Sequence, residues 1–199
     1  MGVEAVKLEI IQTIHGLTHG NRDNWRAGKR LSAKKIVKHF PPHKTYVEPF
    51  AGRAYVFFKN DKYEKAVLND LECKVIREVK KQKCSLKDPA QCEKLKEADV
   101  SCGKDWKKFL KYDSKDTLFY LDPPYENNKT SDKYYEYNDV PLKEVLDHTK
   151  NLKGTVVLSY SPDRRKEICN KKTGFKCKTI HTWSFANPSQ EILAIKKAK

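Results

Sequence analysis

The sequence predicts an α/β fold built around a mostly parallel β-sheet. Short apolar runs of the kind that form buried parallel strands alternate with segments in which apolar residues recur at helical spacing. This alternation indicates βα units, whose ligand sites lie at the carboxyl ends of the strands. Near the end of the chain, two strand-like runs follow each other without a helix between them. These runs predict a hairpin and an antiparallel last strand.

Four apolar runs supply the predicted parallel strands. Residues 45–50 form a strand that runs into a loop, and the other three strands cover 66–69, 117–121 and 155–159. The C-terminal hairpin joins strands at 177–183 and 191–196 through a turn at 186–189. Because each parallel run is short and apolar, each fits a strand that is covered on both faces.

Three segments between these strands carry apolar residues on one helical face. The first helix ends before Pro41 and Pro42, because proline cannot continue a helix. The second begins after Asp70, and the third begins after Asp139. The residues that share a face are, in order, Ala33, Val37 and Phe40; Leu71, Val75 and Val79; and Leu142, Val145, Leu146 and Thr149.

The length of the chain sets its domain organisation. We interpret residues 1–199 as a single domain, because this length suffices for one compact core. Residues 80–116 are charged, contain three of the cysteines and lack a strong apolar period. We therefore expect a short insertion at about 80–116, partly helical around 106–110.

The charge balance points to a polyanionic partner. Lys and Arg number 41 against 26 Asp and Glu, a formal net charge of +15. Such an excess favours a nucleic acid, because neutralising phosphates releases counterions. The alternatives are a merely lysine-rich surface or an anionic membrane surface, although the basic residues are spread along the chain. No apolar run approaches the roughly 20 residues of a membrane span, and we expect a cytoplasmic protein without a membrane partner.

The six cysteines do not form a recognisable metal-binding pattern. They contain no Cys-x-x-Cys pair, and no histidine lies at finger-like spacing from them. We therefore expect no metal. In a reducing cytosol they would be free thiols, whereas a hyperthermophilic source would permit intracellular disulfides, and the composition leaves that choice open.

The strongest functional signal is the tetrapeptide from Asp122 to Tyr125, directly after the strand at 117–121. The Asp122 carboxylate and the Pro123 carbonyl can accept the two N–H groups of an exocyclic amine. The prolines Pro123 and Pro124 hold that acceptor in a rigid turn. Tyr125 offers a face on which a flipped base can stack. The alternative is an ordinary strand-ending turn plugged by a tyrosine.

Three weaker signals accompany the tetrapeptide. Residues 47–52 end a strand and include Gly52, which lets the backbone approach a ligand, although an ordinary βα turn would look the same. Asp70 ends the next strand and suits ribose hydroxyls, but could equally cap the following helix. The segment from Trp25 to Lys29 would by itself be a basic surface loop.

Taken together, the order and spacing of the four segments resemble those of the Dam-type (D12 class) DNA adenine-N6 methyltransferases. The resemblance covers Asn24 to the C-terminus apart from the expected insertion. It implies a Rossmann-like fold dependent on S-adenosylmethionine, and transfer of a methyl group to N6 of adenine in double-stranded DNA. It also makes 80–116 the candidate target-recognition region. No Pro-Cys dipeptide occurs, so a cytosine-C5 mechanism has no nucleophile.

The resemblance also assigns residues to roles. The implied mechanism is direct in-line transfer to a flipped-out base, without a metal or a covalent enzyme intermediate. The implied catalytic residues are Asp122, Pro123, Pro124 and Tyr125, and the implied cofactor-binding residues are Trp25, Lys29, Glu48, Phe50, Gly52, Asp70 and Asp122.

The chain departs from the family pattern at two points. Arg53, Ala54 and Tyr55 follow Gly52 where the family usually has further small residues, and Ala27-Gly28 replaces a Gly-Gly pair. Two alternatives therefore stay open: an RNA adenine-N6 methyltransferase using the same pocket, or a catalytically degenerate DNA-binding protein. The loop at 126–139, rich in tyrosine and lysine, could grip a nucleic-acid backbone or be a solvated loop.

Overall fold

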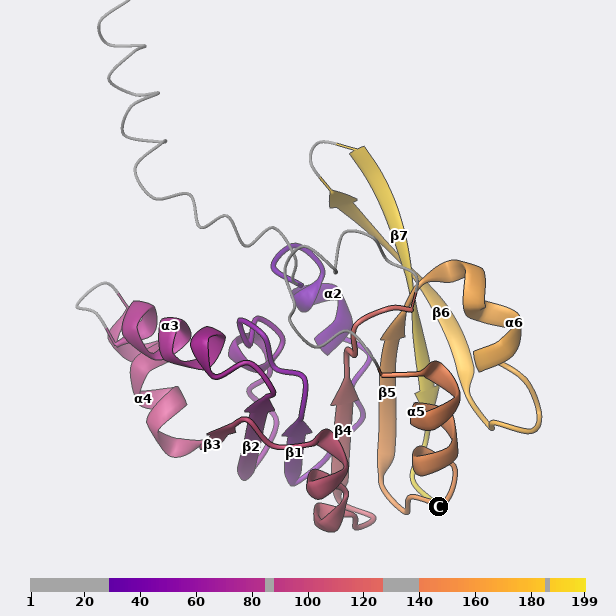
Figure 1. The fold of residues 1–199 in the computed structure, drawn as a ribbon, viewed down its shortest axis with the longest axis horizontal. Helices are drawn as coiled ribbons and strands as arrows, with labels where there is room; N and C mark the ends of the chain where they lie inside the picture. Colours follow the sequence, from indigo (N-terminus) through magenta and orange to yellow (C-terminus); the bar gives the residue numbers. More distant parts are fainter. Residues whose placement is uncertain (1–28, 85–87, 127–139, 185–186) are drawn as a thin grey trace, which may run out of the picture.

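The computed structural model describes residues 29–84, 88–126, 140–184 and 187–199. They form a seven-stranded sheet with the strand order β3-β2-β1-β4-β5-β7-β6 (Figure 1). The strands are β1 (Thr45–Glu48), β2 (Lys65–Asp70), β3 (Asp99–Cys102), β4 (Thr117–Leu121), β5 (Thr155–Tyr160), β6 (Lys176–Ser184) and β7 (Asn187–Lys196).

The direction of the strands agrees with the sequence prediction. Strands β1 to β5 pair in parallel, and β7 runs antiparallel to both β5 and β6. The parallel direction of β1 to β5 places all their carboxyl ends at one edge of the sheet, the upper edge in Figure 1. Strand β7 begins at Asn187, inside the segment expected to be the hairpin turn. The chain is therefore an α/β protein with a mostly parallel sheet and an antiparallel C-terminal strand.

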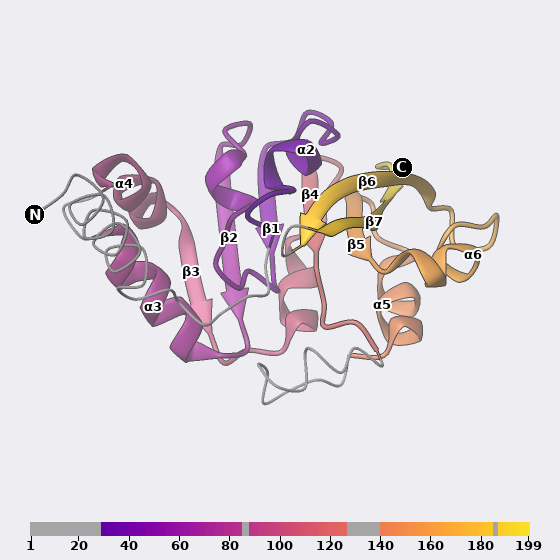
Figure 2. The same ribbon diagram turned by 90° about the horizontal axis from the view of Figure 1, so that it is seen from above.

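Helices cover both faces of the sheet (Figure 2). One apolar cluster joins alternate strand residues such as Tyr46 and Leu118 to α2, η1, α3 and α4. Their neighbours Val47 and Phe119 belong to a second cluster with η2, α5 and α6. The alternation follows from the two-residue period of a strand. The helices are α2 (Ala33–Val37), η1 (Phe57–Lys59), α3 (Cys73–Lys83), α4 (Pro89–Glu97), η2 (Trp106–Tyr112), α5 (Leu142–Thr149), η3 (Pro162–Arg164) and α6 (Arg165–Ile168).

The structure differs from the sequence prediction over residues 80–116. This segment contains the end of α3, all of α4 and strand β3, which pairs in parallel with β2 from Val67↔Asp99 to Asp70↔Cys102. It therefore adds a βα unit to the edge of the sheet. Because β3 is an edge strand, none of its residues is fully buried, and its sequence lacks the apolar run that marks the inner strands.

A second difference concerns Leu71. The helical spacing placed it on one face with Val75 and Val79, and those two residues are buried as expected. Leu71, however, precedes the start of α3 and leaves 43% of its surface exposed at the carboxyl edge of the sheet. A large apolar side chain exposed there suggests a contact other than the protein core.

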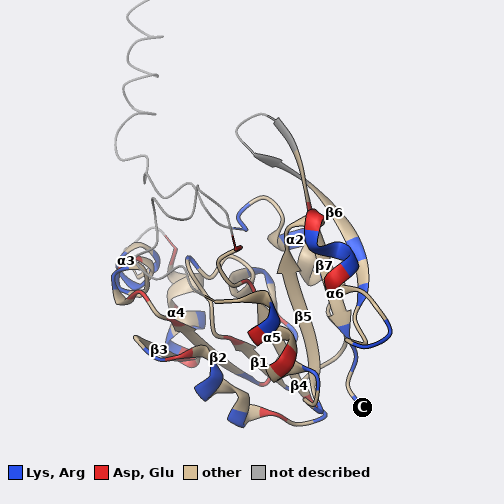
Figure 3. Ribbon diagram, turned by 45° about the vertical axis from the view of Figure 1, so that its right-hand side comes forward, with Lys and Arg blue, Asp and Glu red and all other residues tan. Residues whose placement is uncertain are grey.

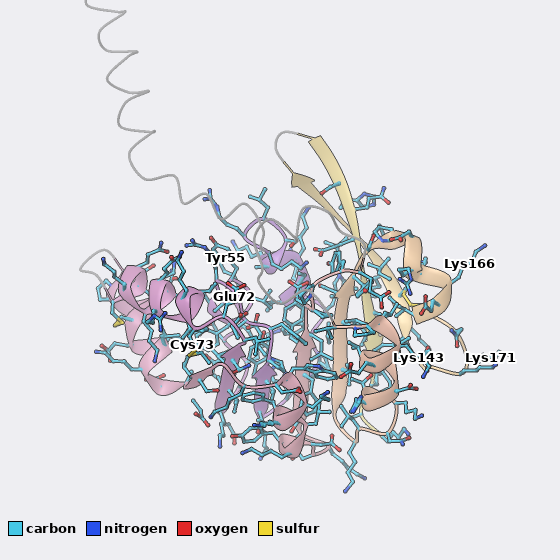
Figure 4. All side chains as sticks on the ribbon, in the orientation of Figure 1. Tyr55, Glu72, Cys73, Lys143, Lys166 and Lys171 are labelled. Atoms are coloured by element: carbon cyan, nitrogen blue, oxygen red, sulfur yellow. A yellow bond between two sulfur atoms is a disulfide. The ribbon has the colours of Figure 1, made fainter. Side chains whose placement is uncertain are left out.

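The structure decides the choice between free thiols and disulfides that the sequence left open, because all six cysteines form disulfides: Cys73–Cys102, Cys84–Cys92 and Cys169–Cys177. Cys102 ends β3, whereas Cys73 begins α3 after the neighbouring strand β2 (Figure 4). The two lie close because β2 and β3 end at the same edge. The Cys73–Cys102 bridge closes the longest of the three loops, with a sequence separation of 29, and by restricting the unfolded chain it is expected to stabilise the fold by about 3 to 4 kcal/mol.

Within the described ranges, no helix is long and apolar enough to cross a membrane. Over the same residues, no group of three or more His, Cys, Asp or Glu side chains is arranged to hold a metal ion.

Candidate active site

The carboxyl ends of β1 and β4 form the centre of the candidate site. These neighbouring strands lead to opposite faces of the sheet: the chain after β1 continues to η1 beneath one face, and the chain after β4 leads to α5 on the other. A crevice at such a switch point is where open α/β sheets bind ligands. Asp122 follows β4 directly, and Glu48 ends β1.

Lys29 links three segments that are far apart in the sequence. Its Nζ lies 2.8 Å from Oδ1 of Asp122 and 2.9 Å from Oε2 of Glu191. It also donates a hydrogen bond of 3.0 Å to the hydroxyl of Tyr125. We call Lys29, Asp122, Tyr125 and Glu191 the lysine cluster. One ammonium group thus fixes both ends of the tetrapeptide against strand β7.

The lysine cluster is poorly exposed, so its charges interact strongly. The exposed fractions of the side chains of Lys29, Asp122 and Glu191 are 16%, 20% and 9%. Burial opposes the charge of Lys29, but Asp122, Tyr125 and Glu191 outweigh it and raise its pKa well above the usual value. Burial and Glu191 raise the pKa of Asp122, although Lys29 partly offsets them. The cluster therefore holds one cation between two carboxyl groups.

Aromatic and ionic contacts fix the far end of the tetrapeptide. The rings of Tyr125 and Tyr160 lie with their centroids 4.7 Å apart. The backbone N–H of Glu126 donates to the Tyr160 hydroxyl at 3.3 Å. The Glu126 carboxylate accepts from the backbone N–H of Leu142 at 2.7 Å and pairs with Arg164 at 2.6 Å. The segment after β4 is thereby tied to β5, α5 and η3.

The turn after β1 is built around Asp70. The Asp70 carboxylate accepts hydrogen bonds from the backbone N–H groups of Gly52 at 2.7 Å and Glu72 at 2.9 Å. Gly52 adopts a φ of 49°, a conformation that favours glycine. A Cβ added at Gly52 would meet no atom of the described residues within 4 Å. The backbone therefore borders open space next to the carboxylate.

Two predicted site residues on this side are held by the protein itself. Glu48 is 2% exposed and accepts a hydrogen bond of 2.9 Å from the Tyr46 hydroxyl. Burial raises the pKa of Glu48 well above its ordinary value. The Phe50 ring packs against Trp106 with a centroid distance of 5.7 Å.

Arg53, the departure from the family pattern, turns toward α3. Its guanidinium donates to Gln82 at 3.0 Å and lies 3.4 Å from a carboxylate oxygen of Glu78. Only 5% of the side chain is exposed. Arg53 therefore packs between the turn and the helix, and does not fill the space next to Gly52.

Some predicted residues lie outside the described ranges. Trp25, the substituted Ala27-Gly28 pair and the loop over 127–139 belong to this group. Of the predicted residues that the structure describes, Lys29 contacts both Asp122 and Tyr125 directly. The Asp70 carboxylate accepts a hydrogen bond from the backbone N–H of Gly52.

The comparison with protein families gives one match that spans most of the chain. The model of the D12 class N6 adenine-specific DNA methyltransferase matches residues 25–92 and 90–187. The chain belongs to this family. The matched ranges of this methyltransferase contain all four segments that the sequence singled out. No curated protein matches the chain at the sequence level.

Solved structures show that this methyltransferase shares its fold with S-adenosylmethionine-dependent methyltransferases. PH1948 from Pyrococcus horikoshii matches with a TM-score of 0.53 and 12% identity, covering 90% of this chain and 91% of its own. The 23S rRNA methyltransferase ErmE has a TM-score of 0.53 and 11% identity, over 83% and 67%. Streptococcus pneumoniae Sp1610, solved with S-adenosyl-L-methionine, has a TM-score of 0.53 and 10% identity, over 84% and 72%.

The described residues of the methyltransferase fit S-adenosylmethionine, its cofactor. Asp70 is a buried carboxylate with acceptor capacity beyond its two backbone contacts, which suits ribose hydroxyls. The open space next to Gly52 admits a ligand close to the backbone. Leu71, next to Asp70, offers an exposed apolar surface on the same edge.

Sequence reasoning missed several residues of the methyltransferase site. Glu191 entered the sequence prediction only as the first residue of the strand at 191–196, and its Oε1 is buried without a hydrogen bond from any residue in the described ranges. Glu126, Tyr160 and Arg164, which hold the tetrapeptide in place, were not singled out. The signal for Tyr160 was its position at the end of β5, since carboxyl ends gather at one edge.

Proposed function

We propose that this methyltransferase transfers the methyl group of S-adenosylmethionine to N6 of adenine in DNA. The observation that carries the proposal is the tetrapeptide from Asp122 to Tyr125, placed at the switch point of the sheet and fixed by Lys29. Membership of a DNA methyltransferase family supports DNA as the substrate.

The chemistry requires an acceptor beside the exocyclic amine. The lone pair of N6 is delocalised into the adenine ring, so the amine is a poor nucleophile until N–H acceptors favour a pyramidal nitrogen. One oxygen of Asp122 is engaged by Lys29, and we assign the other to an N6–H group. The carbonyl of the buried Pro123 would accept the second N–H. Bound S-adenosylmethionine would supply the electrophilic methyl carbon and become a neutral thioether as its C–S bond is replaced by the N6–C bond. The Asp122 oxygen that faces the amine would accept the surplus proton of N6 and pass it to solvent.

Tyr125 would stack on the flipped base. Its ring already packs against Tyr160 and its hydroxyl is held by Lys29, so little rotamer entropy remains to be lost on binding. Flipping is needed because the reacting amine is not accessible in the stacked duplex. We assign the surroundings of the flipped base to 80–116 and to the loop at 126–139, the two candidate regions for gripping the target.

The cofactor would lie along the ends of β1 and β2. Asp70 would bind the ribose, and Leu71 would contact the adenine ring of the cofactor. Phe50 and Gly52 would border its methionine end together with Trp25. We assign Glu48 a supporting role beneath this turn, because its carboxyl group is buried against Tyr46. Lys29 would join the cofactor side to the catalytic tetrapeptide.

Affinity for S-adenosylmethionine is expected to weaken as the pH falls through about 6. Burial raises the pKa of Asp70 to about 6, against the hydrogen bonds from Glu72 and Gly52. The ionised carboxylate is the better acceptor for ribose hydroxyls, so its protonation weakens binding. Calorimetric titration of the cofactor on both sides of this pH measures the effect.

The control for this titration is Asp70→Asn, which should bind more weakly and without the transition near pH 6. Acid unfolding does not explain such a transition. A carboxyl group whose folded pKa is raised contributes stability below its unfolded pKa, and that contribution is lost as the pH rises to about 6. A wild-type affinity that stays constant across this range would contradict the role of Asp70.

The proposed function is tested by methyl transfer from labelled S-adenosylmethionine. Unmethylated duplex DNA and RNA of matched sequence serve as parallel substrates, and the products are digested to nucleosides. The proposal is supported if the wild-type protein places the label in N6-methyldeoxyadenosine and the Asp122→Ala variant does not. Transfer to RNA alone would keep the chemistry and overturn the substrate. Binding of DNA without transfer to either would indicate a degenerate binding protein.

A further inference from the structure

A lysine-lined pocket lies at the edge of the molecule opposite the candidate active site. Its volume is about 440 Å³, and seven of its ten lining residues are lysines. They come from the C-cap of α5 (Lys150), from the loop after α6 (Lys171 and Lys172), from the start of β6 (Lys176), and from the end of β7 and the residues after it (Lys196, Lys197 and Lys199). Figure 3 shows this basic region around the loop after α6 and the C-terminal end of the chain. We call these residues the lysine pocket.

The fold holds one wall of the pocket in place. The loop that carries Lys172 and Lys171, which is labelled in Figure 4, is closed into a ring by the disulfide Cys169–Cys177. Gly174 adopts a φ of 75° within the ring and lies beside the stem of Lys196. A closed ring loses less conformational entropy on binding a ligand than an open loop would. The pocket is therefore formed before any partner arrives.

The buried Lys196 forms the floor of the pocket. Its ammonium donates to the backbone carbonyls of Thr149 and Leu152, where α5 ends. Burial, and then Lys199, lowers the pKa of Lys196. An anion in the pocket would relieve the repulsion between these two lysines.

Acidic groups leave most of this charge uncompensated. Among the described residues, Lys150 alone of the seven forms a salt bridge, 3.6 Å to Asp147, which also pairs with Lys143. Asp113 lies nearby, but its carboxylate accepts the backbone N–H groups of Lys153 and Gly154. Lys196 is buried against backbone carbonyls, and the other five lysines therefore present their charge to solvent or to a ligand.

We propose that the lysine pocket binds the phosphodiester backbone of the nucleic acid at a distance from the methylated base. The proposal rests on the proposed function in taking a nucleic acid as the partner. Lysine ammonium groups act as point charges toward phosphate and carry no base specificity, so the pocket would anchor the substrate without selecting a sequence.

A membrane surface fits the pocket less well. Peripheral membrane binding combines basic residues with exposed apolar ones. In the described part of the chain the exposed large apolar side chains are Leu31 and Leu71, and neither lines the pocket. The pocket is concave and polar, which suits a phosphate chain.

The lysine cluster and the lysine pocket each include a residue of β7. Glu191 belongs to the lysine cluster and Lys196 to the lysine pocket, and both lie on β7. Five residues of antiparallel strand span roughly 17 Å. A duplex bound at the active site must therefore follow the protein over this distance to reach the pocket, so short substrates would miss it.

The test is the double substitution Lys171→Glu/Lys172→Glu, compared with Lys59→Glu/Lys62→Glu. Both pairs are exposed and both substitutions change the net charge equally, but the second pair lies at η1 and in the loop that leads to β2, on the other side of the sheet from β6 and β7. Binding to a duplex DNA of about two helical turns is measured by fluorescence anisotropy at several salt concentrations. We expect the pocket variant to bind about tenfold more weakly, with a salt slope lower by about 1 to 2.

The control pair should stay within about twofold of wild type, and kcat at saturating DNA should be unchanged in both. Equal losses in the two variants would mean a general charge effect and would overturn the proposal. The proposal would also be overturned if the pocket variant bound DNA as tightly as the wild type does. The same holds if the variant lost binding to anionic vesicles but not to DNA. The milder variant Lys171→Gln/Lys172→Gln, together with thermal melting of both pocket variants, shows whether a loss of DNA binding comes from misfolding. Because binding is measured without methylation, weaker DNA binding by the pocket variant supports the pocket even if no methyl group is transferred.

Discussion

Asp122→Ala is expected to lower kcat for methyl transfer by about 10³-fold. The substitution removes the acceptor that we assign to the amine, and losing one such preorganised group typically costs 10² to 10³ in rate, roughly 3 to 4 kcal/mol. The effect should fall on kcat more than on the KM for DNA, since the contact forms at the reacting nitrogen. Steady-state kinetics with labelled S-adenosylmethionine measure both constants.

A matched control is Asp116→Ala, an exposed acid just before the same strand, which should leave kcat unchanged. Asp122→Asn keeps a carbonyl acceptor but loses the ion pair with Lys29, and we expect an intermediate rate. If Asp122→Ala retained more than a tenth of the wild-type kcat while folded, Asp122 would not be the acceptor.

Lys29→Met is expected to destabilise the protein by about 3 kcal/mol and to abolish transfer. Without the ammonium, Asp122 and Glu191 remain as poorly exposed carboxyl groups with no cation between them. Breaking a buried ion pair by removing one partner typically costs about 3 to 5 kcal/mol, and the lower value allows for the exposed fifth of Asp122. Denaturant unfolding followed by circular dichroism measures the loss.

The stability lost in Lys29→Met is expected to depend on pH. Removing Lys29 takes away the contact that lowers the pKa of Asp122, so in the variant that pKa rises further. A raised folded pKa means that stability is retained in acid and lost as the pH rises. The gap between wild type and Lys29→Met should thus be widest at neutral pH and shrink in acid.

The control for this substitution is the double variant Lys29→Met/Glu191→Gln. It removes one of the two facing charges and should recover part of the lost stability. The coupling energy of the cycle isolates the contact between Lys29 and Glu191. Additive losses would show that these two residues do not interact, and would assign Lys29 to the tetrapeptide alone.

Much of the fold followed from local pattern. The inner strands β1, β2, β4 and β5 were predicted because a strand buried on both faces must be a short apolar run. The edge strand β3 was not predicted, because its partly exposed residues produce no such apolar run. Leu71 was misplaced for a related reason: helical spacing does not show where a helix begins.

The sequence by itself determined the family, the mostly parallel sheet and the position of the tetrapeptide after β4, because these depend on the order of residues along the chain. Tertiary structure decided which distant residues meet. It joined Lys29 to Glu191, paired the six cysteines and gathered seven lysines around one pocket. The physical reason is that these contacts depend on which strands are neighbours in the sheet, and hydrophobic periodicity within a segment carries no information about that order.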